Sequence, residues 1–385
     1  MARLTLGAGF AAGLVLAAVP AMADDLRSAL VMAYTTNPTL QSARAQQRAV
    51  DEGVPIARSS ALPSVSATAT YTEFLHDSTS SPLAPNRNLG VSVDAGVPIY
   101  AGGAIRNSVR AARTRVEAGQ ADLRGVESLV FTQTVAAYMD VILGEATVRL
   151  NRANVGRLEV NLQATRDRFE IGDLTRTDVA QSQSRLALAQ GQTRSAEASL
   201  IAARERYIQV VGKAPGTLEP PPPLTGLPAS ADEAVTVALD SNPDLIAARE
   251  RSKAAGYDVN VASAGRLPKV SVFAGGDYGD YLGSNKVPGA DQSSTSAVAG
   301  VRATIPLFQG GLPAAQRRQA QARENVALEQ EIGAEREVIA SVRAAYAQWQ
   351  AAQGLITSSQ SAVDAASLSL EGVRAENTVG NRTIL

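Results

Sequence analysis

The sequence predicts a mainly α-helical fold with a small β part, in which long helical hairpins are joined to four strands. Three observations support this fold class. One structural unit occurs twice, each copy has a stretch of 69 residues with apolar heptads and almost no proline, and alternating apolar and polar residues precede each stretch. The 385 residues are 45% hydrophobic but only 4% aromatic, which favours closely packed long helices over thick globular cores.

The first 23 residues have the pattern of a secretory signal peptide. Arg3 supplies a positive charge, residues 4–19 are largely apolar, and Ala21-Met22-Ala23 is a small-x-small cleavage site. The apolar run ends at Pro20 and is too short for a membrane span of about 20 residues. We expect cleavage after Ala23. No later stretch of 18 residues is apolar throughout, so we expect export without a spanning helix, and no cysteine is present to carry a lipid.

The rest of the chain contains one unit twice. Asn37-Pro38 recurs as Asn242-Pro243 after 205 residues, and Gly102-Gly103 recurs as Gly310-Gly311 after 208 residues. One change of three residues in the loop between the strands explains both offsets. The predicted division is a signal peptide at 1–23, a first repeat at 24–213, a proline-rich linker at 214–229 and a second repeat at 230–385.

The second copy is shorter than the first. The first continues for about 40 residues beyond Gly172, whereas the second stops five residues beyond Gly380, at Leu385. We therefore expect the second repeat to lack its returning helix and the sequence to be a fragment of a longer protein.

Each copy is expected to open with a helix, over about 25–60 and 230–264, and Ser230 and Glu233 have the spacing of a capping box. Two strands follow, with small apolar residues on one face and serine, threonine, Asp94 or Arg302 on the other. This alternation fits a sheet with one face packed on a core. It also fits a barrel wall with one face toward lipid and the other toward water.

The stretches 103–171 and 311–379 are predicted to be helices about 100 Å long at 1.5 Å per residue. A turn at Ile171-Gly172-Asp173 and a returning helix over 175–211 complete an antiparallel hairpin. We interpret the heptad lines as seams between helices. Two heptad runs, joined by an 11-residue step, make up the first line: Val109, Val116, Leu123 and Val130, then Val141, Val148, Val155, Leu162 and Phe169. In the second copy the second run is repeated by Trp349, Ile356, Val363 and Leu370.

The composition excludes several kinds of chemistry. Without cysteine the chain has no disulfide, thiolate metal site or cysteine nucleophile, and its one histidine excludes a paired-histidine zinc motif. A formal charge of −1 gives no overall field to attract nucleic acid. We recognise no nucleotide-binding loop or catalytic cluster. The expectation is no enzymatic activity, no cofactor, no metal and no nucleic-acid partner.

Several motifs together resemble the TolC family of outer-membrane efflux and secretion ducts, over essentially the whole mature chain. They are the two Asn-Pro pairs, Ile305-Pro306-Leu307-Phe308-Gln309-Gly310-Gly311, and Thr378-Val379-Gly380-Asn381-Arg382-Thr383. The resemblance implies a homotrimer, in which each chain gives four strands to a shared 12-stranded transmembrane barrel and the helices form a tunnel through the periplasm. It also implies three kinds of partner: a periplasmic adaptor protein, an inner-membrane transporter and outer-membrane lipid.

In this family the tunnel narrows at the ends of the helical hairpins, where polar and charged side chains hold the helices together. By resemblance, Thr177, Asp178 and Arg382 lie at such positions and belong to a closing network. A simpler interpretation remains open for two of them. Asp178 can be a negative charge that favours the start of its own helix, and Arg382 a solvated turn residue.

The function that the sequence supports is a passive exit duct for efflux or type I protein secretion, located in the outer membrane and extending into the periplasm. The chain has no cysteine that could carry a lipid after the cleavage site, and in this respect it resembles the protein-secretion branch of the family. One alternative is an exported structural or adhesive filament protein, although the signal peptide and the alternating strands argue against it. Another is a periplasmic hydrolase, for which the composition offers hardly any nucleophile or base.

Overall fold

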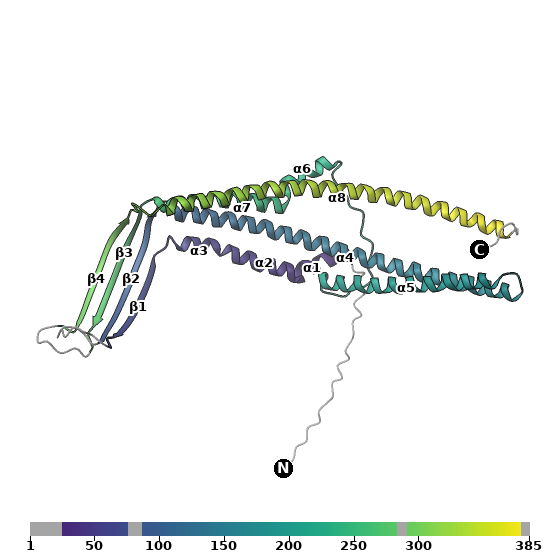
Figure 1. Cartoon of the computed structure of the whole chain (residues 1–385), viewed down its shortest axis with the longest axis horizontal. Helices are drawn as coiled ribbons and strands as arrows, with labels where there is room; N and C mark the ends of the chain where they lie inside the picture. Colours follow the sequence, from purple (N-terminus) through teal and green to yellow (C-terminus); the bar gives the residue numbers. More distant parts are fainter. Residues whose placement is uncertain (1–24, 76–86, 283–290, 379–385) are drawn as a thin grey trace, which may run out of the picture. The chain divides into compact units, whose positions relative to one another are not determined.

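Helices dominate the computed structural model, and four strands form one antiparallel sheet (Figure 1). The structure describes residues 25–75, 87–282 and 291–378. The expected signal peptide with its cleavage site at Ala23, the second turn at Val379-Gly380, and Arg382 lie outside these residues. The chain divides into two compact units, one of residues up to Pro38 together with Leu129–Pro223, the other of Thr39–Ser128 together with residues from Leu224 onward.

The first copy opens with three helices, α1 (Leu26–Thr36), α2 (Pro38–Asp51) and α3 (Gly53–Ser59). The second opens with α6 (Ala231–Ser241), α7 (Pro243–Ser263) and a 3₁₀ turn, η1 (Ala264–Arg266). The predicted continuous helices over 25–60 and 230–264 are therefore wrong where Asn-Pro interrupts them.

The proline ring causes this interruption, since it clashes with a preceding residue in the α conformation. Asn37 accordingly has ψ 123° and Asn242 has ψ 122°. The Asn242 side chain then caps α7 by accepting hydrogen bonds from the N–H groups of Asp244 and Leu245. Each Asn-Pro pair therefore ends one helix and starts the next.

The predicted capping box of α6 is only half formed. The hydroxyl of Ser230 accepts a hydrogen bond from the Glu233 N–H at 3.1 Å, as expected. The Glu233 carboxylate, however, accepts from the N–H of Ala229 at 2.8 Å and not from that of Ser230. The acid reaches one residue further out because Ala229 is the next donor before the helix.

The four predicted strands are confirmed as β1 (Ser64–Glu73), β2 (Arg87–Ala101), β3 (Lys269–Asp280) and β4 (Ser293–Thr304). They pair in sequence order, and every neighbouring pair is antiparallel. The pairing of β2 with β3 joins the two copies in one sheet, with a register shift between Pro98 and Tyr100.

A pair of glycines leads from the sheet into a long helix in each copy. Gly102 and Gly103 have φ 61° and 82°, and Gly310 and Gly311 have φ 58° and 82°, a region that favours glycine. A Cβ on Gly102 would lie only 2.7 Å from the Cβ of Leu267. The helices α4 (Ala104–Glu170) and α8 (Leu312–Thr378) follow these turns, and each has 67 residues, one fewer at either end than the predicted stretches 103–171 and 311–379.

The predicted returning helix is confirmed as α5 (Arg176–Val211), which runs back along α4 (Figure 1). The heptad line of α4 is buried at Val130, Val141, Val148 and Leu162, each no more than 6% exposed. In the second copy Val338, the counterpart of Val130, is likewise buried, whereas Trp349, Ile356, Val363 and Leu370 of α8 are exposed by 38–65%. One cluster of buried residues holds the hairpin together: Ala29, Ala137, Tyr138, Val141, Tyr207, Val211 and Leu218.

Candidate functional site: a two-faced sheet and a helical hairpin

The pairing register sorts the side chains of the sheet onto two faces, because successive residues of a strand point to opposite sides. One face is apolar along its middle, although Val65 is 71% and Val301 68% exposed. Tyr71 and Tyr278 lie toward one end of this face, and Tyr100 lies at the other. Its apolar members are Val65, Ala67, Ala69, Val91, Val93, Ala95, Val97, Val270, Val272, Ala274, Ala297, Ala299, Val301 and Ala303.

The opposite face of the sheet is polar. Serine and threonine recur along β1 and toward both ends of β4, and glycines occur on β2, β3 and β4. Phe273 and Val298 are its large apolar members. Four charged residues lie on this face: Asp94, Lys269, Asp277 and Arg302. The Ser296 hydroxyl donates to Asp277 Oδ2 at 3.2 Å. One face of the sheet thus suits lipid and the other suits water.

The hairpin of α4 and α5 turns at Gly172, whose φ of 85° lies in the left-handed region. The N–H of Asp173 donates to the carbonyl of Arg168 at 2.9 Å. The side chains of the same two residues also interact, since Arg168 Nε donates to Asp173 Oδ2 at 2.8 Å. These contacts fix the tip at which sequence reasoning placed the gate.

Asp178 takes part in a complete capping box at the start of α5. Its Oδ2 accepts from the Thr175 N–H at 2.8 Å and from the Thr175 hydroxyl at 2.7 Å, while the Asp178 N–H donates to that hydroxyl oxygen at 3.4 Å. The side-chain and backbone donors of Thr175 lower the pKa of Asp178 below its ordinary value. Thr177 is exposed beside it. The local role in capping is therefore present, and Arg382 lies outside the described residues.

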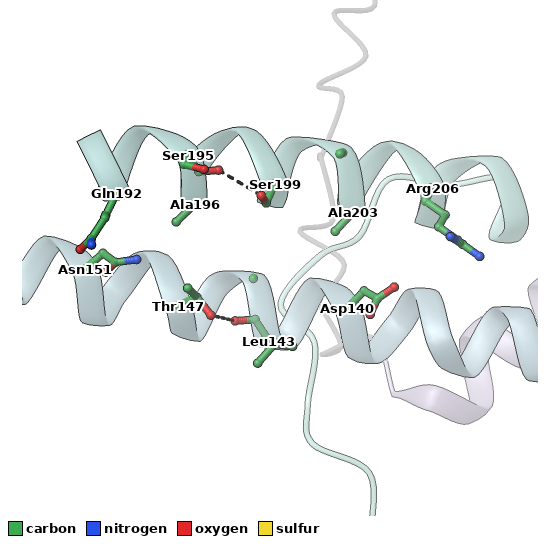
Figure 2. A pocket seen from close by; sticks show the side chains of 12 residues that line it. Asp140, Leu143, Thr147, Asn151, Gln192, Ser195, Ala196, Ser199, Ala203 and Arg206 are labelled. Atoms are coloured by element: carbon green, nitrogen blue, oxygen red, sulfur yellow. Dashed lines mark hydrogen bonds between the residues drawn. The ribbon is translucent and has the colours of Figure 1, made fainter. Parts of the chain in front are cut away.

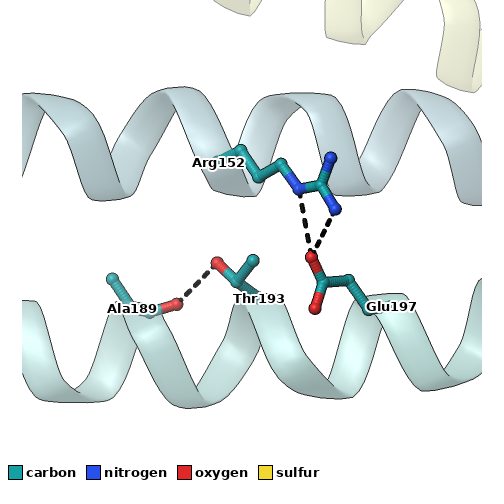
Figure 3. A network of polar contacts seen from close by, with 4 residues as sticks. All are labelled: Arg152, Ala189, Thr193 and Glu197. Atoms are coloured by element: carbon teal, nitrogen blue, oxygen red, sulfur yellow. Dashed lines mark hydrogen bonds and ion pairs between the residues drawn. The ribbon is translucent and has the colours of Figure 1, made fainter.

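Ion pairs connect α4 and α5 along their seam. Glu197 Oε1 accepts from Arg152 Nε at 3.0 Å and from Nη2 at 2.6 Å (Figure 3). Arg204 Nη2 donates to Glu145 at 2.8 Å further along. All four side chains are at least one-third exposed, so each pair stabilises the hairpin by about 0–1 kcal/mol.

An open groove of about 630 Å³ lies between the same two helices (Figure 2). Leu143, Ala196 and Ala203 line its middle, with Asp140 and Arg206 at one end and Asn151 and Gln192 at the other. The sequence analysis missed this groove, because finding it requires the register between the two helices.

The long helix α4 contains an 18-residue window with a mean hydropathy of 1.3, apolar enough to cross a membrane by length and composition alone. Only 28% of the window is buried. Because α4 packs against α5 through Tyr138 and Val141, we assign it to the hairpin. In the described part of the chain no group of three or more acidic or histidine side chains is placed to hold a metal ion.

Helices of 67 residues attached to a sheet with one apolar and one polar face define a class: outer-membrane channels whose barrel continues into a helical conduit. The comparison with known families agrees. The outer membrane efflux protein family matches residues 29–213 and 234–385, and the chain belongs to this family. The filament alternative finds no support.

Relatives in this family have efflux and secretion in their names. The chain is 32% identical to the outer membrane efflux protein BepC of Brucella suis, over its full length and 82% of BepC. It is 26% identical to the outer membrane protein TolC of Vibrio cholerae, over 94% of the chain and 83% of TolC. Identity to the alkaline protease secretion protein AprF of Pseudomonas aeruginosa is 28%, over 66% of the chain and 54% of AprF.

Solved structures share the fold. The CmeC outer membrane channel of Campylobacter jejuni matches with a TM-score of 0.79 at 16% identity, over 93% of this chain and 78% of CmeC. The outer membrane protein VceC of Vibrio cholerae matches with a TM-score of 0.76 at 21% identity, over 93% and 87%. The predicted fold class, with long helical hairpins and four strands per chain, is therefore confirmed.

Proposed function

We propose that three copies of the chain form a channel through the outer membrane. The observation that carries the proposal is the four-stranded sheet with one apolar face, in which β1 and β4 each lack a neighbour on one side within the described residues. The backbone N–H and C=O groups of an unpaired strand edge would find no hydrogen-bond partner inside a membrane. If further copies of the chain close the sheet into a barrel, every strand edge is paired. Twelve strands from three chains suffice.

The apolar face also has the dimensions of a lipid contact. The stretch of β3 from Val270, which pairs with Tyr100, to Tyr278 contains nine residues and joins the two tyrosine levels. A tilted transmembrane strand needs about 9–11 residues, and aromatic residues favour the two membrane interfaces. This agreement supports outer-membrane lipid as a partner of the apolar face.

The proposed channel is passive and catalyses no reaction. It works with an inner-membrane transporter and a periplasmic adaptor protein, as the likeness to both efflux and secretion proteins supports. The groove between α4 and α5 suits a helical adaptor, since Gly144, Ala196 and Ala203 allow close approach and the polar ends offer hydrogen bonds. The cargo is a small exported compound or a type I secretion substrate.

We further propose that Thr177, Asp178 and Arg382 help to close the periplasmic end. Both hydrogen bonds to Asp178 end on Oδ2, which leaves Oδ1 directed elsewhere and able to accept from another helix. The division into repeats 24–213 and 230–385 with a linker at 214–229 is part of the proposal, supported by the recurring order of helices and strands.

Membrane fractionation and cross-linking test the channel. We expect the mature protein in the outer membrane as a cross-linked trimer that conducts ions in planar bilayers. Deletion of the gene should lower either protein secretion or resistance to toxic compounds, which identifies the cargo class. A monomer recovered from the soluble periplasmic fraction would contradict the proposal.

The gate has its own test. Asp178→Ala combined with Arg382→Ala should raise the open probability of single channels, because both charges leave the closing network. Glu205→Ala together with Arg194→Ala, which changes two charges elsewhere on α5, is the matched control. Unchanged gating in the first variant would remove Asp178 and Arg382 from the network.

A further inference from the structure

Two charged residues of opposite sign occupy the same position in the two copies of the repeat. Asp94 lies on β2 and Arg302 on β4, 208 residues apart, which is the offset that relates the two copies after the loop. The pairing register places both on the polar face of the sheet. The duplication therefore repeats the position and reverses its charge.

Neighbouring glycines let both charges lie along the sheet. The carboxylate of Asp94 lies over Gly275, where an added Cβ would come within 3.1 Å of its Oδ1. The ring of Phe273 lies over Gly300, where a Cβ would come within 3.1 Å of the ring. The Arg302 guanidinium stacks on this ring, with its central carbon 4.8 Å from the ring centroid. Each charged side chain is thus held against the polar face of the sheet.

We infer that Asp94 and Arg302 of three chains form a ring of six charges of alternating sign around the inside of the barrel. Because the six charges sum to zero, the ring gives the barrel little preference between cations and anions. The inference rests on the proposed trimeric channel. In such a barrel three chains with two copies each place six similar units around the axis. Equivalent positions of these units therefore lie at the same height.

The alternation matters because equal charges of opposite sign cancel along the pore axis. The two other charges on the polar face, Lys269 and Asp277, also sum to zero. Removing one sign leaves three uncompensated charges, which we place at roughly 10 Å from the axis of a 12-stranded barrel, with a screening length of about 10 Å at 0.1 M salt. The permeability ratio of cations to anions then changes about fourfold.

Reversal potentials of single channels in a potassium chloride gradient test the ring. We expect Arg302→Gln to raise the cation-to-anion ratio about fourfold and Asp94→Asn to lower it by a similar factor. The double variant should return to the original ratio, and all differences should shrink in 1 M salt. Arg87→Gln is the matched control, since Arg87 pairs with Glu73 on the opposite face.

The outcomes separate the inference from the proposed function. If the unchanged protein forms no channels, the proposed function fails. If it conducts and both single variants keep its ratio, the ring is wrong and the channel stands.

Arg302→Cys gives an independent measurement, because the chain has no other cysteine. A positively charged thiol reagent should reverse the change in selectivity at this position. It should have no effect on Val301→Cys, one residue away on the apolar face. Equal responses at both positions, or none at Arg302→Cys, would overturn the inference.

Discussion

Removing the hydroxyl of Tyr138 should release the linker from the helical hairpin. Tyr138 is fully buried, and its hydroxyl donates to the Glu219 carbonyl at 2.7 Å while accepting from the Glu219 N–H at 3.1 Å. Tyr138→Phe keeps the ring in its cluster and removes both bonds. At about 0.5–1.5 kcal/mol for each hydrogen bond, the attachment weakens by about 1–3 kcal/mol.

Hydrogen exchange measured by mass spectrometry detects this change directly. A loss of about 1–3 kcal/mol corresponds to roughly 5- to 150-fold faster exchange of the amide of Glu219, since local opening governs the rate. Tyr346 is the matched control, because it is the equivalent residue of the second copy and its hydroxyl makes a single hydrogen bond among the described residues, donated to the Ala229 carbonyl at 2.9 Å. Tyr346→Phe should accelerate exchange near Ala229 less. Unchanged exchange at Glu219 in Tyr138→Phe would refute the reasoning.

Four further substitutions test the hairpin. Gly144→Val should destabilise the hairpin by about 1–3 kcal/mol, because even a Cβ added there would lie 3.1 Å from Leu200 Cδ1. Gly156→Ala has open space around it and should stabilise α4 by about 1 kcal/mol. Thermal unfolding midpoints, measured at one scan rate, distinguish the two variants. Thr175→Ala should cost about 1 kcal/mol and speed exchange in the first turn of α5. The lowered pKa of Asp178 means that its stabilising effect is complete above the ordinary value of 3.8 and is lost as pH falls through the folded-state pKa, so the difference from Asp178→Asn in helix content should vanish in acid.

The long elements were predictable because each has a strong local cause. Glycine pairs with positive φ mark the starts of α4 and α8, and Gly172 marks the turn between α4 and α5. Between these points the heptads set which side of the helix is buried. The break at Asn37 was missed, although the rule that proline disfavours a preceding α conformation was sufficient to find it.

The sites were less accessible to sequence reasoning than the elements. Capping depends on neighbours in the chain, so Thr175 with Asp178 could have been recognised from the T-x-x-D spacing alone. The groove beside Gly144 depends on how two helices are aligned, and the stack of Arg302 on Phe273 depends on strand register. Neither alignment is encoded in one segment. Both follow only when two distant segments are paired.

The two copies show which positions the backbone needs and which are free to change. Both copies keep the Asn-Pro pairs, with ψ 123° and 122°, and the glycine pairs, with nearly equal positive φ angles. At these positions another residue would alter the path of the chain. Asp94 and Arg302 occupy equivalent positions of the two copies and carry opposite charges. A side chain on the polar face can change in this way without moving the strand. A duplicated chain can thus keep a repeating scaffold while the charge on its polar face alternates between the copies.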